Sequence, residues 1–354
     1  YDRASDTFRP VDWEEAFQRI GEVLHGLEPD QVEFYTSGRA SNEAAYLFQL
    51  FAREYGTNNF PDCSNMCHEA TSVGLPRSIG IGKGTVSLDD FDKTELVISI
   101  GHNPGTNHPR MMGTLHELAR RNVPIIVFNP LRERALERFA DPQSVIEMAT
   151  YGSTDIASTY FQVKAGGDAA ALKGIAKHLL EMESERGDVL DRAFIAEHTQ
   201  GFEDFAADIA QTRWDEIERE SGLSQAALKQ VAEAYAKSNA TIITYGMGIT
   251  QHNKGTANVR LIADLLLMRG NIGKPGAGIC PLRGHSNVQG NRTVGISEKP
   301  TPAFLNRLKE VFGFEPPSHH GHDAVQATQA MIDGRAKALI CLGGNFAVAM
   351  PDHE

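Results

Sequence analysis

The chain has 354 residues, of which 41% are hydrophobic, and it carries a formal net charge of −12 at pH 7. A chain of this length exceeds one simple core and favours two domains, or two halves of one large α/β unit. The acidic balance argues against non-specific nucleic-acid binding, and no apolar run approaches the roughly 20 residues of a membrane-spanning helix. We therefore expect neither nucleic acid nor a membrane among the partners.

The cysteine usage indicates a reducing compartment. Four cysteines are too few for a disulfide scaffold in a chain this long, and no secretory signal is visible. Cys280 and Cys341 stand in apolar segments, where we expect them to be buried as small hydrophobic side chains. We expect a cytoplasmic protein. Because the chain lacks an initial Met and stops just after a strand signal, we also expect a fragment of a larger protein.

Five short apolar runs rich in β-formers each lead into a loop that contains Gly or Asn. These runs begin at Val32, Glu95, Val123, Ala240 and Lys337. Helical patterns lie between them, and alternation of strand, loop and helix is typical of parallel sheets. The sequence therefore predicts an α/β protein with mostly parallel sheets and helices on both faces.

Local signals mark the ends of individual helices. Ser41 is a good N-cap for a helix that Gly56 can end in a left-handed turn, and Ser224 opens another helix. Asp168 is expected to cap the helix that follows it. These signals place helices firmly between the predicted strands.

The order of these patterns suggests four consecutive parts. Residues 1–30 would lead in from a missing N-terminal domain, and 30–165 would form a first α/β block. Residues 166–237 read as a helical connecting region, and 238–354 as a second α/β block that is truncated at its C-terminus.

Several loops at predicted strand ends combine Gly with Asn, but none has a known phosphate-binding fingerprint. "SIGIGKG" at 78–84 lacks the spacing of a P-loop, and no GxGxxG follows a strand. The loops at 101–104, 128–130, 246–248 and 343–345 could each be an ordinary tight turn. Four of them at successive strand ends favour one or two large ligands along the sheet edge, approached by glycine backbone and read by Asn amides.

A long polar stretch, "CPLRGHSNVQGNR" at 280–292, follows an apolar helix. Loops of this length without regular structure are often functional. Arg283 and Arg292 are its only cations, and a guanidinium suits bidentate contact with an anion. A surface loop with solvated arginines is the alternative.

The stretch "PDCSNMCHEATSVG" at 61–74 places Cys63, Cys67 and His68 close together. A structural zinc site would need four ligands, and a thioredoxin-type pair would need two intervening residues rather than three. Two interpretations remain beside these: a buried structural thiol, or one reactive or metal-bound thiolate with His68 as its acid–base neighbour. A helix beginning near Glu69 would stabilise a thiolate at Cys67.

Three segments together resemble the alpha subunits of molybdopterin-dependent formate dehydrogenases. These segments are "GTNNFPDCSNMCHEATSVGL" (56–75), "GHNPGTNHP" (101–109) and the long stretch 247–290, which contains "RGHSNVQG". The resemblance covers the chain from about residue 30 to its end. It implies two Rossmann-like blocks of the formate dehydrogenase/DMSO reductase-like type.

The resemblance implies a molybdenum or tungsten centre with two molybdopterin guanine dinucleotides. Cys67 would ligate the metal, His68 would accept a proton, and Arg283 would clamp the substrate through charge-assisted hydrogen bonds. A 4Fe-4S cluster would be expected only in a missing N-terminal region, because this chain has no four-cysteine motif.

The resemblance also assigns residues to the two dinucleotides. For one it implies Gly101, His102, Asn103, Asn129, Gly166 and Asp168. For the other it implies Gly246, Met247, Gln251, Gly344 and Asn345, and it adds Gly284 and Asn287 to the cofactor-binding set.

The reaction implied is two-electron oxidation of a small anion, formate above all, with electrons passing to a partner protein or carrier. Two alternatives stay open within the same family. The chain could belong to a non-catalytic scaffold subunit of an electron-transfer complex, or to a reductase of an oxyanion or N-oxide.

Overall fold

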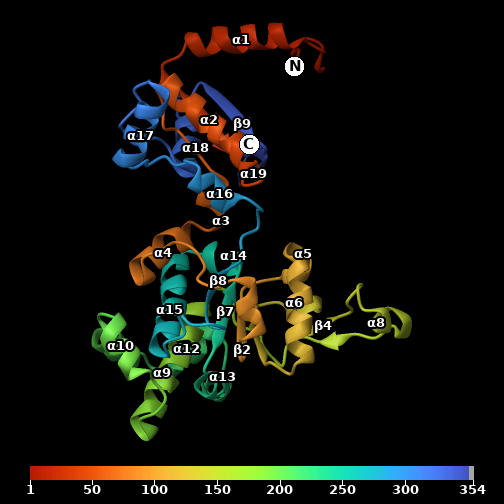
Figure 1. Ribbon diagram of the computed structural model, residues 1–354, viewed down its shortest axis with the longest axis vertical. Coiled ribbons are helices and arrows are strands. Elements are labelled where there is room, and N and C mark those ends of the chain that lie inside the picture. The colour runs from red at the N-terminus through yellow and green to blue at the C-terminus, as the bar shows by residue number, and fades with distance from the viewer. Residues whose placement is uncertain (351–354) are drawn as a thin grey trace. The chain divides into compact units, whose positions relative to one another are not determined.

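The computed structural model describes residues 1–350, and the last four residues of the predicted second block lie outside the described residues. The chain divides into two compact units (Figure 1). Unit 1 comprises Tyr1–Met66 and His285–Glu354, and unit 2 is the continuous stretch Cys67–Gly284. The domain boundaries expected from the sequence stay a prediction, and strand pairing groups the segments in another way, as described next.

Unit 2 is built on a five-stranded parallel sheet in the order β6-β3-β2-β7-β8. Its strands are β2 (Leu96–Ile100), β3 (Ile125–Phe128), β6 (Thr159–Phe161), β7 (Thr241–Tyr245) and β8 (Gly278–Pro281). Strand β7, expected in a second block, pairs directly with β2 of the first. All carboxyl ends therefore meet at one edge of a single sheet.

Alternation along the strands divides the apolar side chains of unit 2 between two cores. Ile98, Ile100 and Ile243 enter one core, which is completed by α4, α9, α13 and α15. Val97 and Ile242 enter the other, against α6. Helices α6 and α15 flank the strands from opposite sides (Figure 1). Burial on both faces is the normal state of a parallel sheet.

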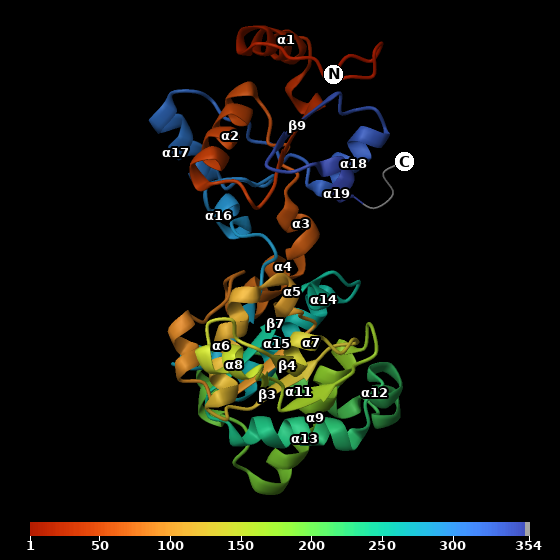
Figure 2. The ribbon, with the colours of Figure 1, turned by 90° about the vertical axis from the view of Figure 1, so that its right-hand side faces the viewer.

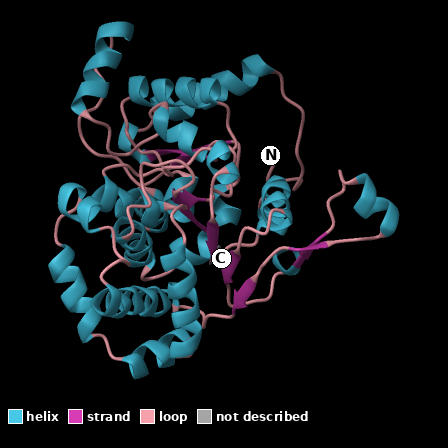
Figure 3. Cartoon of the chain, turned by 60° about the horizontal axis from the view of Figure 1, so that its bottom comes forward, coloured by secondary structure: helices cyan, strands magenta, loops and turns pink. Residues whose placement is uncertain are grey.

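Helices make up most of the chain (Figure 3). In unit 2 they are α4 (Glu69–Ile79), η2 (Leu88–Asp92), α5 (Pro104–Asn107), α6 (Pro109–Arg120), α9 (Asp168–Arg186), α10 (Arg192–His198), α11 (Phe202–Gln211), α12 (Trp214–Ser221), α13 (Gln225–Lys237), α14 (Met247–Thr250) and α15 (Gly255–Met268). The region predicted to be helical contains α9 to α13 (Figure 2). Ser224 caps α13 as expected. The prediction for Asp168 was wrong, because Gly167 takes the cap position and Asp168 is the first helical residue.

Between β3 and β6 the chain of unit 2 makes an excursion, which we call the arm (residues 138–155). It contains β4 (Arg138–Phe139), α8 (Val145–Thr150) and β5 (Thr154–Asp155), and it follows α7 (Arg134–Glu137). Strands β4 and β5 pair in antiparallel fashion and carry α8 between them (Figure 1). The sequence did not predict this segment.

Unit 1 is built on two parallel strands, β1 (Val32–Thr36) and β9 (Ala338–Leu342). Its helices are α1 (Trp13–His25), η1 (Pro29–Gln31), α2 (Asn42–Tyr55), α3 (Cys63–Cys67, whose last residue opens unit 2), α16 (Val288–Thr293), α17 (Pro302–Phe312), α18 (Ala324–Ile332) and α19 (Phe346–Ala349). Ser41 caps α2 and Gly56 ends it at φ +118°, both as expected. A Ser N-cap of this kind stabilises a helix by about 1 kcal/mol.

The structure confirms the predicted fold class and all five predicted strands. Four strands were missed. β4 and β5 have two residues each and β6 has three, and β8 contains Pro281, a residue that counts against a strand in the sequence. In residues 1–350, no helix combines the length and the apolar character needed to cross a membrane.

Candidate functional site

A cavity of about 170 Å3 lies at the carboxyl ends of β2, β3 and β7 in unit 2. Its lining comprises Gly101, His102, Asn103, Asn107, His108, Asn129, Glu133, Gly246, Met247, Gly248 and Leu282. Six of these residues are among those implied by the sequence resemblance. Because β7 pairs with β2, Gly246 and Met247, implied for one dinucleotide, line the same cavity as Gly101 and Asn103, implied for the other. The assignment of residues to the two dinucleotides stays a prediction.

The glycines of this cavity let two strand-end loops touch each other. Gly101 adopts φ +58°, and a Cβ added to Gly246 would lie 2.8 Å from the Gly101 carbonyl oxygen. A Cβ added to Gly248 would lie 2.9 Å from Gly101 Cα, and the Gly248 N–H donates to the Gly101 carbonyl at 3.1 Å. Glycine is therefore required for backbone packing here, whereas the sequence suggested close approach to a ligand.

The two asparagines of the cavity hold the loops in place. The Asn103 side chain caps α5 by accepting from the Thr106 N–H at 3.2 Å, and its amide donates to Glu133 Oε2 at 2.6 Å. The Asn129 amide donates to the His102 carbonyl at 3.2 Å. Each amide thus uses one of its two N–H groups to hold the protein backbone or a side chain.

Two histidines form a hydrogen-bonded pair beside the cavity. His102 Nε2 lies 2.8 Å from His108 Nδ1, and His108 Nε2 lies 2.6 Å from the Arg283 carbonyl oxygen. Burial lowers the pKa of His102 to about 3, with a smaller effect from His108. His108 was not predicted as a site residue, although a second His six residues after His102 is visible in "GHNPGTNHP", just before the next helix.

Cys67 is buried in unit 2 and contacts two residues of α14, the short helix that follows β7. Its thiol lies 3.3 Å from the Met247 thioether sulfur, and its carbonyl accepts from Thr250 Oγ1 at 2.7 Å. The expected helix follows directly, as α4 from Glu69. Two soft sulfur atoms therefore lie side by side next to the cavity that Met247 lines.

His68 is fully buried and has hydrogen bonds at both ring nitrogens. Its Nε2 donates to the Leu282 carbonyl at 2.9 Å, and its Nδ1 lies 3.1 Å from Thr71 Oγ1. Thr71 Oγ1 in turn lies 2.9 Å from the Tyr245 hydroxyl. Burial, with a smaller effect from the charge of Arg283, lowers the pKa of His68 to about 4. His68 is therefore a neutral imidazole at pH 7.

Arg283 follows β8 and lies within electrostatic reach of His68. Its Nη2 donates to the Gly82 carbonyl at 3.1 Å, and its charge also acts on the pKa of Tyr245, which burial raises. Cys67, His68 and Arg283 thus all belong to unit 2, and each contacts a residue of the cavity lining: Met247, Leu282 and His108, respectively. Their catalytic roles remain predictions.

Arg292, the other cation of the polar stretch, belongs to unit 1 and is held by carboxylates. Its Nε lies 3.1 Å from Asp62 Oδ2 and its Nη1 lies 2.7 Å from Glu298 Oε2. Asp62 is fully buried. This geometry makes Arg292 a structural cation rather than an anion clamp.

Cys63 and Asn287 also have structural contacts within unit 1. Cys63 is buried, as expected for a structural thiol, and its Sγ accepts from the Gly38 N–H at 3.0 Å. The Asn287 amide donates to the Ala40 carbonyl at 2.8 Å. Both residues therefore hold the loop that follows β1.

The remaining residues assigned from the resemblance do not line this cavity. In unit 2, Gly166 adopts φ +82°, and burial raises the pKa of Asp168. Gln251 follows α14, and Gly284 is the last residue of the unit. In unit 1, Gly344 and Asn345 follow β9, where Asn345 caps α19.

The two cysteines expected to be buried differ. Cys280 is half-buried in β8, and burial raises the pKa of its thiol to about 12, so it is inert. Cys341 is exposed, and the prediction for it was wrong. Within residues 1–350, β9 pairs only with β1.

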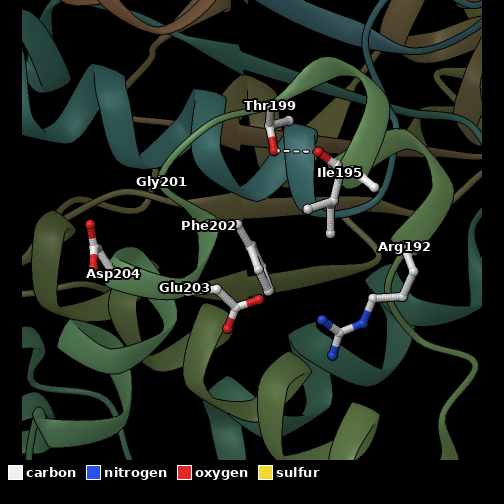
Figure 4. A pocket seen from close by; sticks show the side chains of 8 residues that line it. Arg192, Ile195, Thr199, Gly201, Phe202, Glu203 and Asp204 are labelled. Atoms are coloured by element: carbon white, nitrogen blue, oxygen red, sulfur yellow. Dashed lines mark hydrogen bonds between the residues drawn. The ribbon is translucent and has the colours of Figure 1, made fainter.

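A second cavity, of about 380 Å3, lies among the helical segments of unit 2 (Figure 4). Arg192 and Phe202 line it, with the guanidinium 5.3 Å from the ring, and Arg192 pairs with Glu183 at 2.8 Å. None of the residues singled out from the sequence lies there. Within residues 1–350, no three His, Cys, Asp or Glu side chains are grouped to hold a metal ion, so the structure gives the zinc interpretation no ligand cluster.

The sheet and its cavity define a parallel α/β protein with a cavity at the carboxyl ends of its strands, the place where ligands sit in such sheets. The family model for molybdopterin oxidoreductase matches residues 1–354. The chain therefore belongs to the molybdopterin oxidoreductase family, and the resemblance predicted from its sequence is confirmed.

Named relatives agree with this assignment. The chain is 59% identical over 360 residues to Protein YdeP of Escherichia coli K12, covering 100% of this chain and 47% of that protein. It is 30% identical over 349 residues to formate dehydrogenase H of the same organism, covering 94% of this chain and 46% of that protein. The chain thus spans about half the length of these relatives.

A solved structure shares the fold. Acetylene hydratase from Pelobacter acetylenicus superimposes with a TM-score of 0.68 at 15% sequence identity, covering 95% of this chain and 47% of that chain. At this identity the likeness concerns the fold alone.

The family implies a molybdenum or tungsten pterin cofactor, and the cavity provides a test of fit. His102 lines it, and the buried His102 Nδ1 has no hydrogen-bond partner among the described residues. A polar group entering the cavity could meet this atom, as the ring nitrogens of a pterin would. At about 170 Å3 the cavity accommodates part of such a cofactor.

Proposed function

We propose that this chain carries the metal-binding and proton-handling residues of a molybdopterin oxidoreductase that oxidises a small anion, formate foremost. One observation carries the proposal: unit 2 alone holds Cys67, His68 and Arg283 together with the strand-end cavity. Formate is suggested by the likeness to formate dehydrogenase H. The whole protein, which in its relatives is about twice as long, would perform the reaction.

When bound, the cofactor would supply two-electron chemistry at molybdenum or tungsten, in its guanine dinucleotide form. Cys67 would provide the protein's thiolate ligand, a soft donor suited to such a metal. Met247, with its sulfur 3.3 Å from the Cys67 sulfur, would keep water from one side of that thiolate. The cavity lining would hold part of the pterin.

Arg283 would orient the substrate carboxylate by two charge-assisted hydrogen bonds. Its present donation to the Gly82 carbonyl occupies Nη2 and would have to be shared or exchanged. Because the Gly82 carbonyl is neutral, a charged carboxylate would form a stronger hydrogen bond with the guanidinium than that carbonyl does.

His68 would accept the proton released by the substrate. As a neutral imidazole it donates at Nε2 to Leu282, so its lone pair is at Nδ1, where Thr71 lies 3.1 Å away. A proton on Nδ1 would make His68 the donor and turn the Thr71 hydroxyl towards Tyr245. Thr71 therefore stands between His68 and any proton source on that side.

The decisive experiment replaces Cys67 in the full-length protein matured in a host that makes the cofactor. Cys67→Ala should lose turnover entirely and most of the bound metal, measured by elemental analysis for molybdenum and tungsten. Cys63→Ala is the matched control: it removes a buried thiol four residues earlier and should keep the metal. Metal and turnover that survive Cys67→Ala would refute the ligand role.

The substrate is tested on the unmodified full-length protein. Formate should reduce an artificial electron acceptor, whereas nitrate should not oxidise a reduced carrier. Activity with nitrate alone would support the oxyanion reductase. A protein that acquires no molybdenum or tungsten would support the scaffold interpretation.

A further inference from the structure

The hydrogen bonds around His102 and His108 fix the positions of their protons. A carbonyl oxygen only accepts, so the 2.6 Å contact with the Arg283 carbonyl requires a hydrogen on His108 Nε2. In a neutral ring, His108 Nδ1 then carries a lone pair. The 2.8 Å contact to His102 Nε2 therefore requires a hydrogen on His102 Nε2, which leaves a lone pair on His102 Nδ1.

Adding one proton to the histidine pair turns His102 Nδ1 from a hydrogen-bond acceptor into a donor. If His108 takes the proton, its Nδ1–H donates to His102 Nε2, and a neutral His102 must then carry its hydrogen on Nδ1. If His102 takes it, Nδ1 is protonated directly. Either way His102 Nδ1 becomes a donor, so the charge of the pair decides whether this atom accepts or donates.

The surroundings favour the neutral pair. His102 is 4% exposed, and burial opposes a charge on it. The neighbouring rings of His108 and His68 add smaller effects that also lower the pKa of His102. Arg283 contacts the pair through its backbone carbonyl. Glu133, which also lines the cavity, is bound by the Asn103 amide.

We propose that His108 acts as a positioning residue that locks His102 as a hydrogen-bond acceptor and holds the backbone of Arg283. His102 lines the cavity, and its Nδ1 has no hydrogen-bond partner among the described residues. As an acceptor, this atom selects a ligand with an N–H donor, such as a pterin ring, over an anionic oxygen. The inference rests on the proposed function for the identity of the ligand, but the proton positions do not depend on it.

The proton positions are tested on the chain itself, without cofactor, by nitrogen NMR of 15N-histidine-labelled protein at pH 8. Both His102 and His108 should be neutral with hydrogen on Nε2. A hydrogen on His102 Nδ1, or a charged ring at either position, would overturn the proposal. Because this measurement needs no bound metal, it stands even if the proposed function fails.

Two substitutions of His108 separate its two contacts. His108→Asn retains an oxygen near the Nδ1 position and should keep His102 in the Nε2–H form. His108→Gln retains an N–H near the Nε2 position for the Arg283 carbonyl, but it should let His102 become a mixture of tautomers. In the loaded enzyme, His108→Asn should raise the KM for the anion about tenfold, because Arg283 loses its anchor. Identical spectra and identical KM values for both variants would reduce His108 to a structural role and contradict the proposal.

The ligand preference is tested by cofactor retention in the full-length protein, measured as pterin fluorescence after extraction. His102→Leu removes the acceptor and should lower pterin per chain about tenfold, whereas His102→Asn, which restores an oxygen near Nδ1, should retain most of it. Equal pterin in the parent and in His102→Leu would refute the acceptor role. Absence of pterin from the parent itself would instead count against the proposed function.

Discussion

Two arginines show how a structural cation differs from a candidate substrate-binding cation. Arg53, on α2, is fully buried; it donates to the Gly295 and Ser297 carbonyls and stacks on the Phe60 ring at 4.6 Å. Burial lowers its pKa to about 9. Arg283 also donates to a backbone carbonyl, that of Gly82, but its own carbonyl accepts from His108, which lines the strand-end cavity. Its place next to the cavity makes Arg283 the better candidate to bind an anion.

Removal of the Arg292 guanidinium should destabilise the protein strongly. Arg292→Met leaves Asp62, which is fully buried, without its counter-charge, and such a loss costs about 3 kcal/mol. Urea unfolding at pH 7 measures this difference. Arg213→Met is the control: the Arg213–Asp215 pair has side chains 76% and 61% exposed, and its loss should cost less than about 1 kcal/mol. Equal effects would contradict the assignment of Arg292 as a structural cation.

Among the elements, the loops after β2 and β7 pack closely against each other because glycines at their contact have no side chains. Gly248→Ala places a Cβ 2.9 Å from Gly101 Cα and should destabilise the protein by about 2 kcal/mol through overpacking. Gly113→Ala is the matched control, because nothing lies within 4 Å of its Cβ on α6, and it should stabilise the helix by about 1 kcal/mol. Thermal unfolding of both variants measures the contrast, and a stabilising Gly248→Ala would show that the loops separate freely.

The arm is attached to α6 by the partly buried carboxylate of Glu147. Glu147 Oε2 accepts from the Asp141 N–H at 2.7 Å, and Oε1 lies 2.8 Å from Nε2 of the buried His116. The Asp141 N–H bond, followed by those from His116 and Thr154, lowers the pKa of Glu147 to about 2 from 4.5. The folded state therefore favours the charged form of this group.

The attachment should weaken in acid. A lowered pKa gives stability that is present above about pH 4.5 and is lost as the pH falls towards 2. Amide exchange of residues 138–155, corrected for its intrinsic pH dependence, should accelerate across this window. Glu147→Gln should show fast exchange already at pH 6, with β2 and β7 unchanged as an internal control. An arm that exchanges equally slowly in parent and variant would show that Glu147 does not hold it.

At the scale of the whole molecule, the sequence predicted the parallel α/β class because each buried strand is a continuous apolar run followed by a Gly or Asn loop. It could not predict which strands pair. β7 joins β2 across more than a hundred residues, and local patterns hold no information on that choice. The cavity residues were therefore found, but not their grouping. His108 was missed because it contacts the backbone carbonyl of Arg283, and a sequence motif does not predict such a contact between distant residues.

The insertion of unit 2 into unit 1 has a consequence for the order in which the protein is made. β1 ends at Thr36 and its partner β9 begins at Ala338, so 301 residues (37–337) separate them. At roughly 5–20 residues per second, synthesis of that interval takes about 15–60 s. Unit 2 is complete on the ribosome before β9 exists, and throughout that time β1, buried along its whole length in the finished fold, has no partner strand. The nascent chain must therefore keep β1 from aggregating until β9 has been synthesised and can pair with it.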